Sequence, residues 1–415
     1  MRLILQKRSL RFVFAANVIS MLGSGMNSAA VAWTILQKTH SEMALGTFAV
    51  LQTIPAMLIL PFTGVIIDRE DRRRLVMMLD VARAVVIAVV AVLAFLNRVQ
   101  VWQLYLMNTL VAAGFWMFWP TITALIQELT PEGEFVHSNT LLLAGVQGGW
   151  MIAGAIVGFV YEHIGLGGVL LIDVSTYVVS FLCYFAVRQG RVVPAAAELK
   201  HDIEAAETAL AKFLREMLEG VAFLRERRKV VFLGTSWALF LGAMMTGVVV
   251  TAPLSDRIFH AGASGYGWLN GGWGVGAFLS ALYAPVLIAR LGARGSIAIS
   301  MLLLTLAMAV SPFSPWLALA VLLYGLMGSA RGVSGVAMNT SLMEQVPPQF
   351  MGRVQNTFYF FGMLLQIALA IAVGAIAQRV SLAGGFGVIA AVYAVAFGSA
   401  CWPMKAEQAM ATAAD

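Results

Sequence analysis

The chain has 415 residues, of which 60% are hydrophobic and only 12% are charged, and its formal net charge is +6. Soluble domains carry roughly 25% charged residues, and the mean hydropathy here is +0.84. So few charges cannot cover a water-facing surface, which excludes a string of soluble domains and makes the lipid bilayer the main solvent. We therefore expect an all-α integral membrane protein.

Apolar segments recur along the chain, and each is close to the roughly 20 residues that a spanning helix needs. The first is too long for a signal-peptide core of roughly 7–15 residues, so we expect it to remain as a transmembrane helix. The segments predict twelve transmembrane helices, at 12–36, 44–67, 75–96, 101–126, 136–160, 166–187, 230–253, 264–288, 295–311, 316–341, 354–377 and 382–402.

Lysine and arginine are concentrated in alternate loops. With the N-terminus in the cytoplasm, the inner segments hold 21 of the 27 basic residues, and the outer loops hold four, Lys38, Arg98, Arg257 and Arg379. Cytoplasmic loops of membrane proteins carry such an excess. We therefore expect a multi-pass protein of the plasma (inner) membrane with both termini in the cytoplasm, and a positive net charge that reflects topology rather than nucleic-acid binding.

The longest polar stretch, 188–229, divides the segments six and six. It predicts a cytoplasmic linker with an amphipathic helix on the membrane surface, because apolar residues recur at helical intervals, at Ile203, Leu210, Phe213, Met217, Val221 and Leu224. A regulatory docking role is the alternative. We expect an N-terminal six-helix half at 1–187 and a C-terminal six-helix half at 230–415.

The two halves resemble each other at an offset of 217 residues. Leu125 matches Leu342, Pro131 matches Pro348 and Gly145 matches Gly362, and the pair Asn139-Thr140 matches Asn356-Thr357. All of these positions fall where the fourth segment of a half passes into the fifth. Repeated halves of parallel topology are one architecture that transporters use for alternating access.

The loop after the second segment reads Gly64-Val-Ile-Ile-Asp68-Arg69-Glu-Asp71-Arg72-Arg73-Arg74. It resembles the signature loop of the major facilitator superfamily, in the variant with Asp71 that is typical of the branch holding macrolide efflux proteins and the enterobactin exporter. The resemblance runs from about residue 9 to 402. It implies two pseudo-symmetric six-helix halves, secondary transport without a cofactor, and a conformational latch at the loop, formed by Gly64, Asp68, Arg69, Arg72 and Arg73.

The chemistry of the loop is consistent with such a latch. Asp68 ends the second segment, where a carboxylate can meet the positive N-terminal end of a neighbouring helix. The arginines can pair with carboxylates across the seam between the halves or with anionic lipid. A simple positive-inside anchor is the alternative for the arginines.

The fifth segment carries Gly145, Gly154 and Gly158. They partly match the antiporter motif of the superfamily's drug exporters, although the proline of that motif is absent. Gly154-x-x-x-Gly158 equally predicts close helix packing.

Ionisable side chains inside spanning helices are costly and are candidates for function. Arg331 lies well inside the tenth segment, where we predict an arginine of the substrate cavity that binds an anion or acts as a gate. The alternative is an ion pair with Glu344 or Glu128. Asp80 and Arg83 lie three residues apart and predict an ion pair that braces the signature loop, with proton coupling as the alternative.

Asp173 opens the sixth segment and is a candidate either for a helix-end carboxylate or for a coupling residue. The resemblance implies that the first, fourth, seventh and tenth helices line the central cavity. Polar and aromatic side chains there would suit an amphipathic ligand. In addition to Arg331 we assign to the cavity Asn17, Asn27, Asn108, Trp116, Trp119, Trp237 and Asn339.

The leading hypothesis is a monomeric secondary active exporter, an ion-coupled antiporter for amphipathic small molecules with protons as a candidate ion. A carrier for one anionic substrate, such as a siderophore or a lysophospholipid, is the alternative. A polytopic membrane enzyme is a remote third, because no metal-ligand cluster is visible and the histidines are scattered, at His40, His137, His163, His201 and His260.

Overall fold

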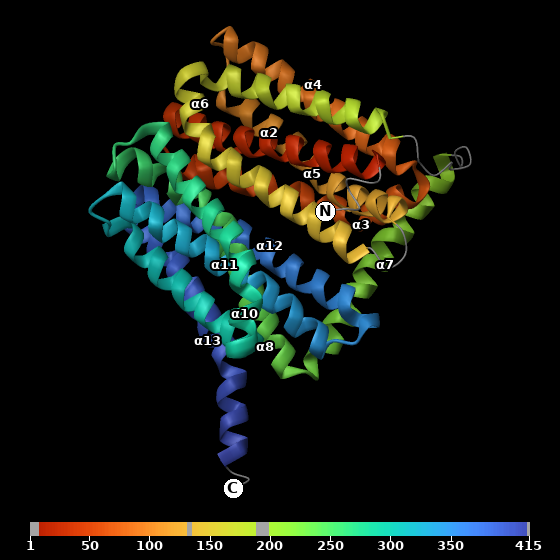
Figure 1. Ribbon diagram of the computed structural model, residues 1–415, viewed down its shortest axis with the longest axis vertical. Coiled ribbons are helices and arrows are strands. Elements are labelled where there is room, and N and C mark those ends of the chain that lie inside the picture. Colours follow the sequence, from red (N-terminus) through yellow and green to blue (C-terminus); the bar gives the residue numbers. More distant parts are fainter. Residues whose placement is uncertain (1–7, 131–134, 188–198, 413–415) are drawn as a thin grey trace. The chain divides into compact units, whose positions relative to one another are not determined.

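The computed structural model describes residues 8–130, 135–187 and 199–412 (Figure 1). The side chains of Gly64, Asp68 and Arg69 lie outside the described part. The described elements are helices: α2 (Arg8–Thr39), α3 (Glu42–Arg69), α4 (Arg72–Phe95), α5 (Val101–Leu129), α6 (Phe135–Phe185), α7 (Leu199–Arg225), α8 (Arg228–Thr246), α9 (Val248–Pro253), η1 (Leu254–Ile258), α10 (Gly262–Val310), η2 (Ser311–Phe313), α11 (Leu317–Gln345), α12 (Pro348–Arg379) and α13 (Leu382–Thr412).

Ten helical stretches of the described chain are long and apolar enough to cross a membrane. Two of them are too long for one crossing and are each broken by a glycine. Gly165 breaks α6 with φ 64°, and Gly292 breaks α10 with φ 71°. Positive φ is strained for residues with a Cβ, so glycine belongs at these turns. Counting each broken helix as two gives the twelve segments expected from hydropathy.

The chain forms two compact units. The N-terminal unit comprises Met1–Lys38 and Leu51–Phe213, and the C-terminal unit comprises Thr39–Val50 and Leu214–Asp415. The division differs from the hydropathy boundaries in two places. The first residues of α3 pack in the C-terminal unit, and the linker helix α7 is shared between the units.

Equivalent glycines occupy equivalent places in the two halves. A Cβ at Gly145 of α6 would touch the side chains of Phe14 and Val18 in α2. A Cβ at Gly362 of α12 would touch Ala238 and Leu241 in α8. The fifth segment of each half therefore packs closely on the first segment of that half, as expected for a structural repeat.

The helices α10 and α11 of the C-terminal unit approach each other backbone to backbone. A Cβ at Gly276 would overlap the backbone carbonyl of Gly325, and one at Gly328 would overlap the carbonyl of Trp273. Small residues at such spacing allow backbones to approach in membranes, where dispersion contacts rather than hydrophobicity hold helices together. This crossing brings Trp273 beside Arg331.

The second half of α7 docks on the start of α12, within the C-terminal unit. Glu219 forms an ion pair with Arg353, with 3.0 Å between the nitrogen and oxygen atoms. The rings of Phe223 and Phe350 stack with centroids 4.7 Å apart. The opposite face of α7 leaves apolar side chains exposed at four-residue spacing, at Leu210, Leu214 and Leu218. Of the apolar residues predicted to face the membrane, Leu224 is buried instead, and a position of α7 on the membrane surface stays a prediction.

Candidate functional site

Two polar stripes face each other inside the N-terminal unit, one on α2 and one on α6. The amide of Asn17 donates to the hydroxyl of Tyr184 at 3.1 Å. Farther along, the hydroxyls of Ser24 and Tyr177 lie 2.9 Å apart. Asn17 is buried between helices, so the structure gives it a hydrogen-bonding role inside the unit, and its contact with a substrate stays a prediction.

Asp173 lies at the end of these stripes, eight residues beyond the break at Gly165. Its carboxylate accepts a hydrogen bond from the amide of Asn27 at 2.6 Å and a longer one from Thr176 at 3.4 Å. The side chain is 0% exposed, so Asp173 is not a surface carboxylate at a helix end. Gly23 is required opposite, because a Cβ there would overlap Thr176 and Asp173.

Asp80 and Arg83 of α4 form a fully buried ion pair, with 2.6 Å between a guanidinium nitrogen and a carboxylate oxygen. The hydroxyl of Ser180 donates to the other carboxylate oxygen at 2.6 Å. The guanidinium of Arg83 lies over the rings of Phe118 and Tyr177, at 4.6 and 4.5 Å from their centroids. The pair thus joins α4 to α5 and α6 in the interior of the unit, rather than the signature loop.

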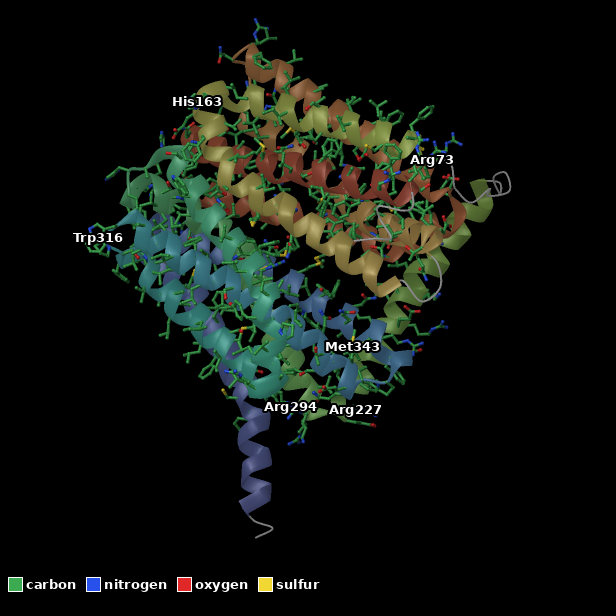
Figure 2. The ribbon with its side chains drawn as sticks, in the orientation of Figure 1. Arg73, His163, Arg227, Arg294, Trp316 and Met343 are labelled. Atoms are coloured by element: carbon green, nitrogen blue, oxygen red, sulfur yellow. The ribbon has the colours of Figure 1, made fainter. Side chains whose placement is uncertain are left out.

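Two arginines of the signature loop bind partners within the N-terminal unit rather than across the seam. Arg72 pairs with Glu128 at 3.0 Å and donates to the carbonyl of Ala124 at 3.1 Å. Arg73 donates to the carbonyls of Tyr184 and Phe185 at 2.8 and 2.7 Å. Figure 2 shows that Arg73 and His163 lie at opposite ends of the N-terminal unit.

The arginine at 73 therefore caps the last carbonyls of α6, where a positive charge is favourable. Asp71 caps the start of α4 by accepting from the backbone N–H of Arg74 at 2.8 Å. Gly64, Asp68 and Arg69 lie outside the described side chains, so the latch remains a prediction.

A second polar cluster joins α2, α3 and α5. Gln52 donates to Asn108 and to Ser28, both at 3.2 Å. The indole of Trp116 donates to the backbone carbonyl of Gln52 at 3.4 Å. Trp119 instead packs against the apolar core of the unit. Asn108 and Trp116 thus share one polar site, to which sequence reasoning had not assigned Gln52.

Arg331 lies in the C-terminal unit with its guanidinium 5.1 Å from the centroid of the Trp273 ring. Among the described side chains, no carboxylate forms an ion pair with it. Glu128 is engaged by Arg72 in the other unit, and Glu344 is exposed farther along α11.

The other predicted cavity residues of this unit have local contacts. Trp237 stacks on Phe240 with centroids 5.0 Å apart. Asn339 is exposed and accepts a hydrogen bond from Gln355 at 3.4 Å.

Sequence reasoning missed the partners of the buried charges, although a signal was present. Polar residues of the first segment recur at intervals of three and four, at Asn17, Ser20, Ser24 and Asn27. Those of the sixth recur likewise, at Asp173, Thr176, Tyr177, Ser180 and Tyr184. Each set lies on one helix face, and two polar faces in an apolar setting must find each other.

An ion pair that sequence reasoning also missed fixes the start of α3 in the C-terminal unit. Glu42, which is 0% exposed, pairs with Arg257 of η1 at 2.6 Å. Arg257 also donates to the carbonyl of His40 at 2.8 Å. Gln378 of α12 accepts from Ser41 at 2.8 Å. We call these contacts the α3 clasp.

We expect Glu42→Gln to loosen the α3 clasp, because a charged hydrogen bond contributes about 1.5–3 kcal/mol. The readout is thiol labelling of Ala49→Cys in a protein without its two native cysteines, since Ala49 is buried. Labelling should become about tenfold faster or more. Lys38→Gln, which removes one charge from an exposed side chain, is the control. Unchanged labelling in Glu42→Gln would show that the ion pair does not hold α3.

The fold and the buried polar network define a class, the multi-pass helical membrane proteins that are built as two repeated halves. Residues 13–258 match the Major Facilitator Superfamily. This match covers more than half of the chain, which therefore belongs to that superfamily of transporters.

Relatives and solved structures agree with this assignment. Macrolide efflux protein A from Streptococcus pyogenes is 22% identical over 372 residues, covering 86% of each chain. The multidrug efflux pump Tap from Mycolicibacterium fortuitum is 23% identical over 345 residues, covering 80% of each chain.

Among solved structures, a bacterial homologue of the iron transporter ferroportin in an inward-facing state matches with a TM-score of 0.74. It is 16% identical, with 95% and 98% of the two chains covered. The nucleoside transporter NupG matches with a TM-score of 0.71 at 15% identity, with 95% and 99% covered. At these identities the structures establish the fold alone.

Proposed function

We propose that the protein is a secondary active exporter of amphipathic small molecules in the plasma membrane. In this proposal it works by alternating access with both termini in the cytoplasm, and Asp173 carries the coupling proton. The names of the efflux relatives support export. The sparse polar groups around Gln52 and Arg331, set among apolar and aromatic side chains, suit ligands that are part apolar and part polar.

The observation that carries the coupling role is the setting of Asp173. Its carboxylate is fully buried and its hydrogen-bond donors, Asn27 and Thr176, are neutral. Arg83 acts on it electrostatically but already pairs with Asp80, and a charged carboxylate without a cation of its own costs several kcal/mol in such a place. Its charge is therefore tied to its surroundings, and a change in those surroundings would bind or release a proton.

Asn27 provides the link from proton to helix. A charged Asp173 accepts a strong hydrogen bond from the amide of Asn27, because hydrogen bonds to ionised groups are about twice as strong as neutral ones. A protonated Asp173 has a weaker hold on Asn27 and can itself donate. Proton exchange would thus change how firmly α2 is held on α6, and in this superfamily the first helix lines the cavity.

The test is transport in proteoliposomes with an imposed pH gradient, over a panel of amphipathic ligands. We expect Asp173→Asn to lower gradient-driven transport at least tenfold, because the amide keeps the size of the side chain but carries no proton. Exchange of ligand without a gradient should persist. Glu344→Gln, which changes an exposed carboxylate of α11, should leave both activities unchanged.

Full gradient-driven transport by Asp173→Asn would contradict the coupling role while leaving export standing. Absence of transport of every ligand by the wild type, in both directions of the gradient, would contradict export itself.

A second candidate is a carrier for an anionic substrate, favoured by the setting of Arg331. A guanidinium stays charged even when it is partly buried, as Arg331 is, and the described contact of Arg331 is the face of Trp273 rather than a carboxylate. An anionic ligand could supply the missing charge. Exclusive transport of the anionic members of the panel would favour this candidate over a general exporter.

A further inference from the structure

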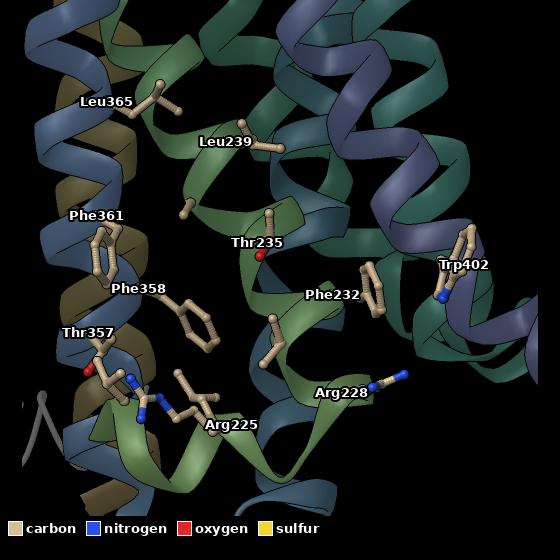
Figure 3. A pocket seen from close by; sticks show the side chains of 14 residues that line it. Arg225, Arg228, Phe232, Thr235, Leu239, Thr357, Phe358, Phe361, Leu365 and Trp402 are labelled. Carbon is tan, nitrogen blue, oxygen red and sulfur yellow. The ribbon is translucent and has the colours of Figure 1, made fainter. Parts of the chain in front are cut away.

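A cavity of about 720 Å³ lies in the C-terminal unit where α7, α8, α12 and α13 meet (Figure 3). Its size is that of a typical small-molecule pocket. Neither the proposed coupling residue nor the polar clusters contribute to it. Its walls are mostly apolar, and they include Phe232, Leu239, Phe361, Leu365 and Trp402.

The lower end of the cavity in Figure 3 carries two arginines, Arg225 on the side of α12 and Arg228 on the side of α13. Both side chains are exposed. Arg225 ends α7 and Arg228 begins α8, so the positive N-terminal end of α8 lies at the same place. Of the neighbouring residues 226, 227 and 229, one is acidic and two are basic.

The cavity is open along one side, where Thr235, Phe361 and Trp402 are exposed, and it combines apolar walls with a positive mouth. A soluble anion would use the mouth and leave the walls empty, and a neutral apolar molecule would leave the arginines without a counter-charge. A molecule with a long acyl chain and a negatively charged head satisfies both. The mouth also lies on the basic linker, which the positive-inside rule places at the cytoplasmic leaflet, where anionic lipids attract basic segments.

We infer that this cavity is a binding site for an anionic phospholipid, with an acyl chain between α8, α12 and α13 and the phosphate at Arg225 and Arg228. The exposed leucines of α7 lie on the helix that leads to this mouth, which would keep the linker at the same lipid surface. The bound lipid fastens the end of α7 to three spanning helices.

The fluorescence of Trp402 reports occupancy of this site. The protein is reconstituted in vesicles of unlabelled phosphatidylcholine. A small, varied fraction of one brominated lipid is added, either phosphatidylglycerol or phosphatidylcholine with brominated acyl chains. The bromine atoms quench indole fluorescence. The difference between the wild type and Trp402→Phe isolates the signal of Trp402 from the other nine tryptophans. Half-maximal quenching should need an about thirtyfold lower fraction of brominated phosphatidylglycerol than of brominated phosphatidylcholine, as expected for two basic contacts.

The double variant Arg225→Gln/Arg228→Gln should lose this preference, and Arg290→Gln, which removes an exposed positive charge outside the cavity, should keep it. Thr235→Phe fills the cavity with the arginines intact and should also abolish the preference. If thermal melting shows that the double variant is misfolded, Thr235→Phe alone tests whether the cavity binds the anionic lipid. Equal curves for the two lipids in the wild type, or an unchanged preference in Thr235→Phe, would overturn the inference.

Discussion

Replacing Arg83 with glutamine should lower the free energy of unfolding by about 3–5 kcal/mol, the range for breaking a buried ion pair. The change leaves the carboxylate of Asp80 buried with Ser180 as its remaining donor. It also removes the cation from the faces of Phe118 and Tyr177. Thermal melting of the purified protein in detergent measures the loss.

Two further variants separate the ion pair from other effects. The double variant Asp80→Asn/Arg83→Gln removes both charges and should recover part of the loss, because no uncompensated charge remains. Arg98→Gln, at an exposed loop position, should melt within about 0.5 kcal/mol of the wild type. A double variant no more stable than Arg83→Gln alone would mean that packing rather than charge holds Arg83 in place.

Alanine at Gly328 should destabilise the C-terminal unit by about 3 kcal/mol, the upper part of the range for overpacking. Its Cβ would overlap the backbone carbonyl of Trp273, and a carbonyl cannot rotate away as a side chain can. The helices α10 and α11 would have to separate, and Trp273 would shift relative to Arg331. Thermal melting and the near-ultraviolet circular dichroism of tryptophan report the two effects.

Gly398→Ala is the matched control for Gly328→Ala. Gly398 is exposed in α13, and a Cβ there would meet no atom within 4 Å. Alanine is the better helix former by about 1 kcal/mol, so this variant should be as stable as the wild type or slightly more stable. Similar melting of the two variants would show that the α10–α11 crossing tolerates a methyl group.

The number and order of the spanning segments could be predicted from the sequence, because hydropathy reports the solvent of each segment directly. The neighbours of each helix face could not. Asn17 and Asn27 were assigned to the cavity on the ground that the first helix lines it, yet both lie against α6. The sequence pattern indicates that one face of a helix is polar, but it does not indicate which helix that face packs against.

The ion pair of Glu42 and Arg257 was beyond sequence reasoning for a different reason. The two residues are 215 positions apart, and each stands in a short polar stretch of sequence between apolar segments, where a charge is ordinary. The glycines of α11 are an intermediate case. Their spacing at Gly325, Gly328 and Gly332 predicts a close helix contact, but it does not name α10 as the partner.

The division of α3 between the two units has a mechanical consequence. Pro55 has no backbone N–H, so the carbonyl of Leu51 cannot receive the usual hydrogen bond from four residues ahead. Leu51 is the residue at which α3 passes from the C-terminal to the N-terminal unit. The helix can therefore flex at this boundary without losing a backbone hydrogen bond, as it can one turn before its second proline, Pro61. In the proposed transport cycle we expect α3 to bend near Leu51, because Pro55 leaves the carbonyl of Leu51 without its helical hydrogen bond.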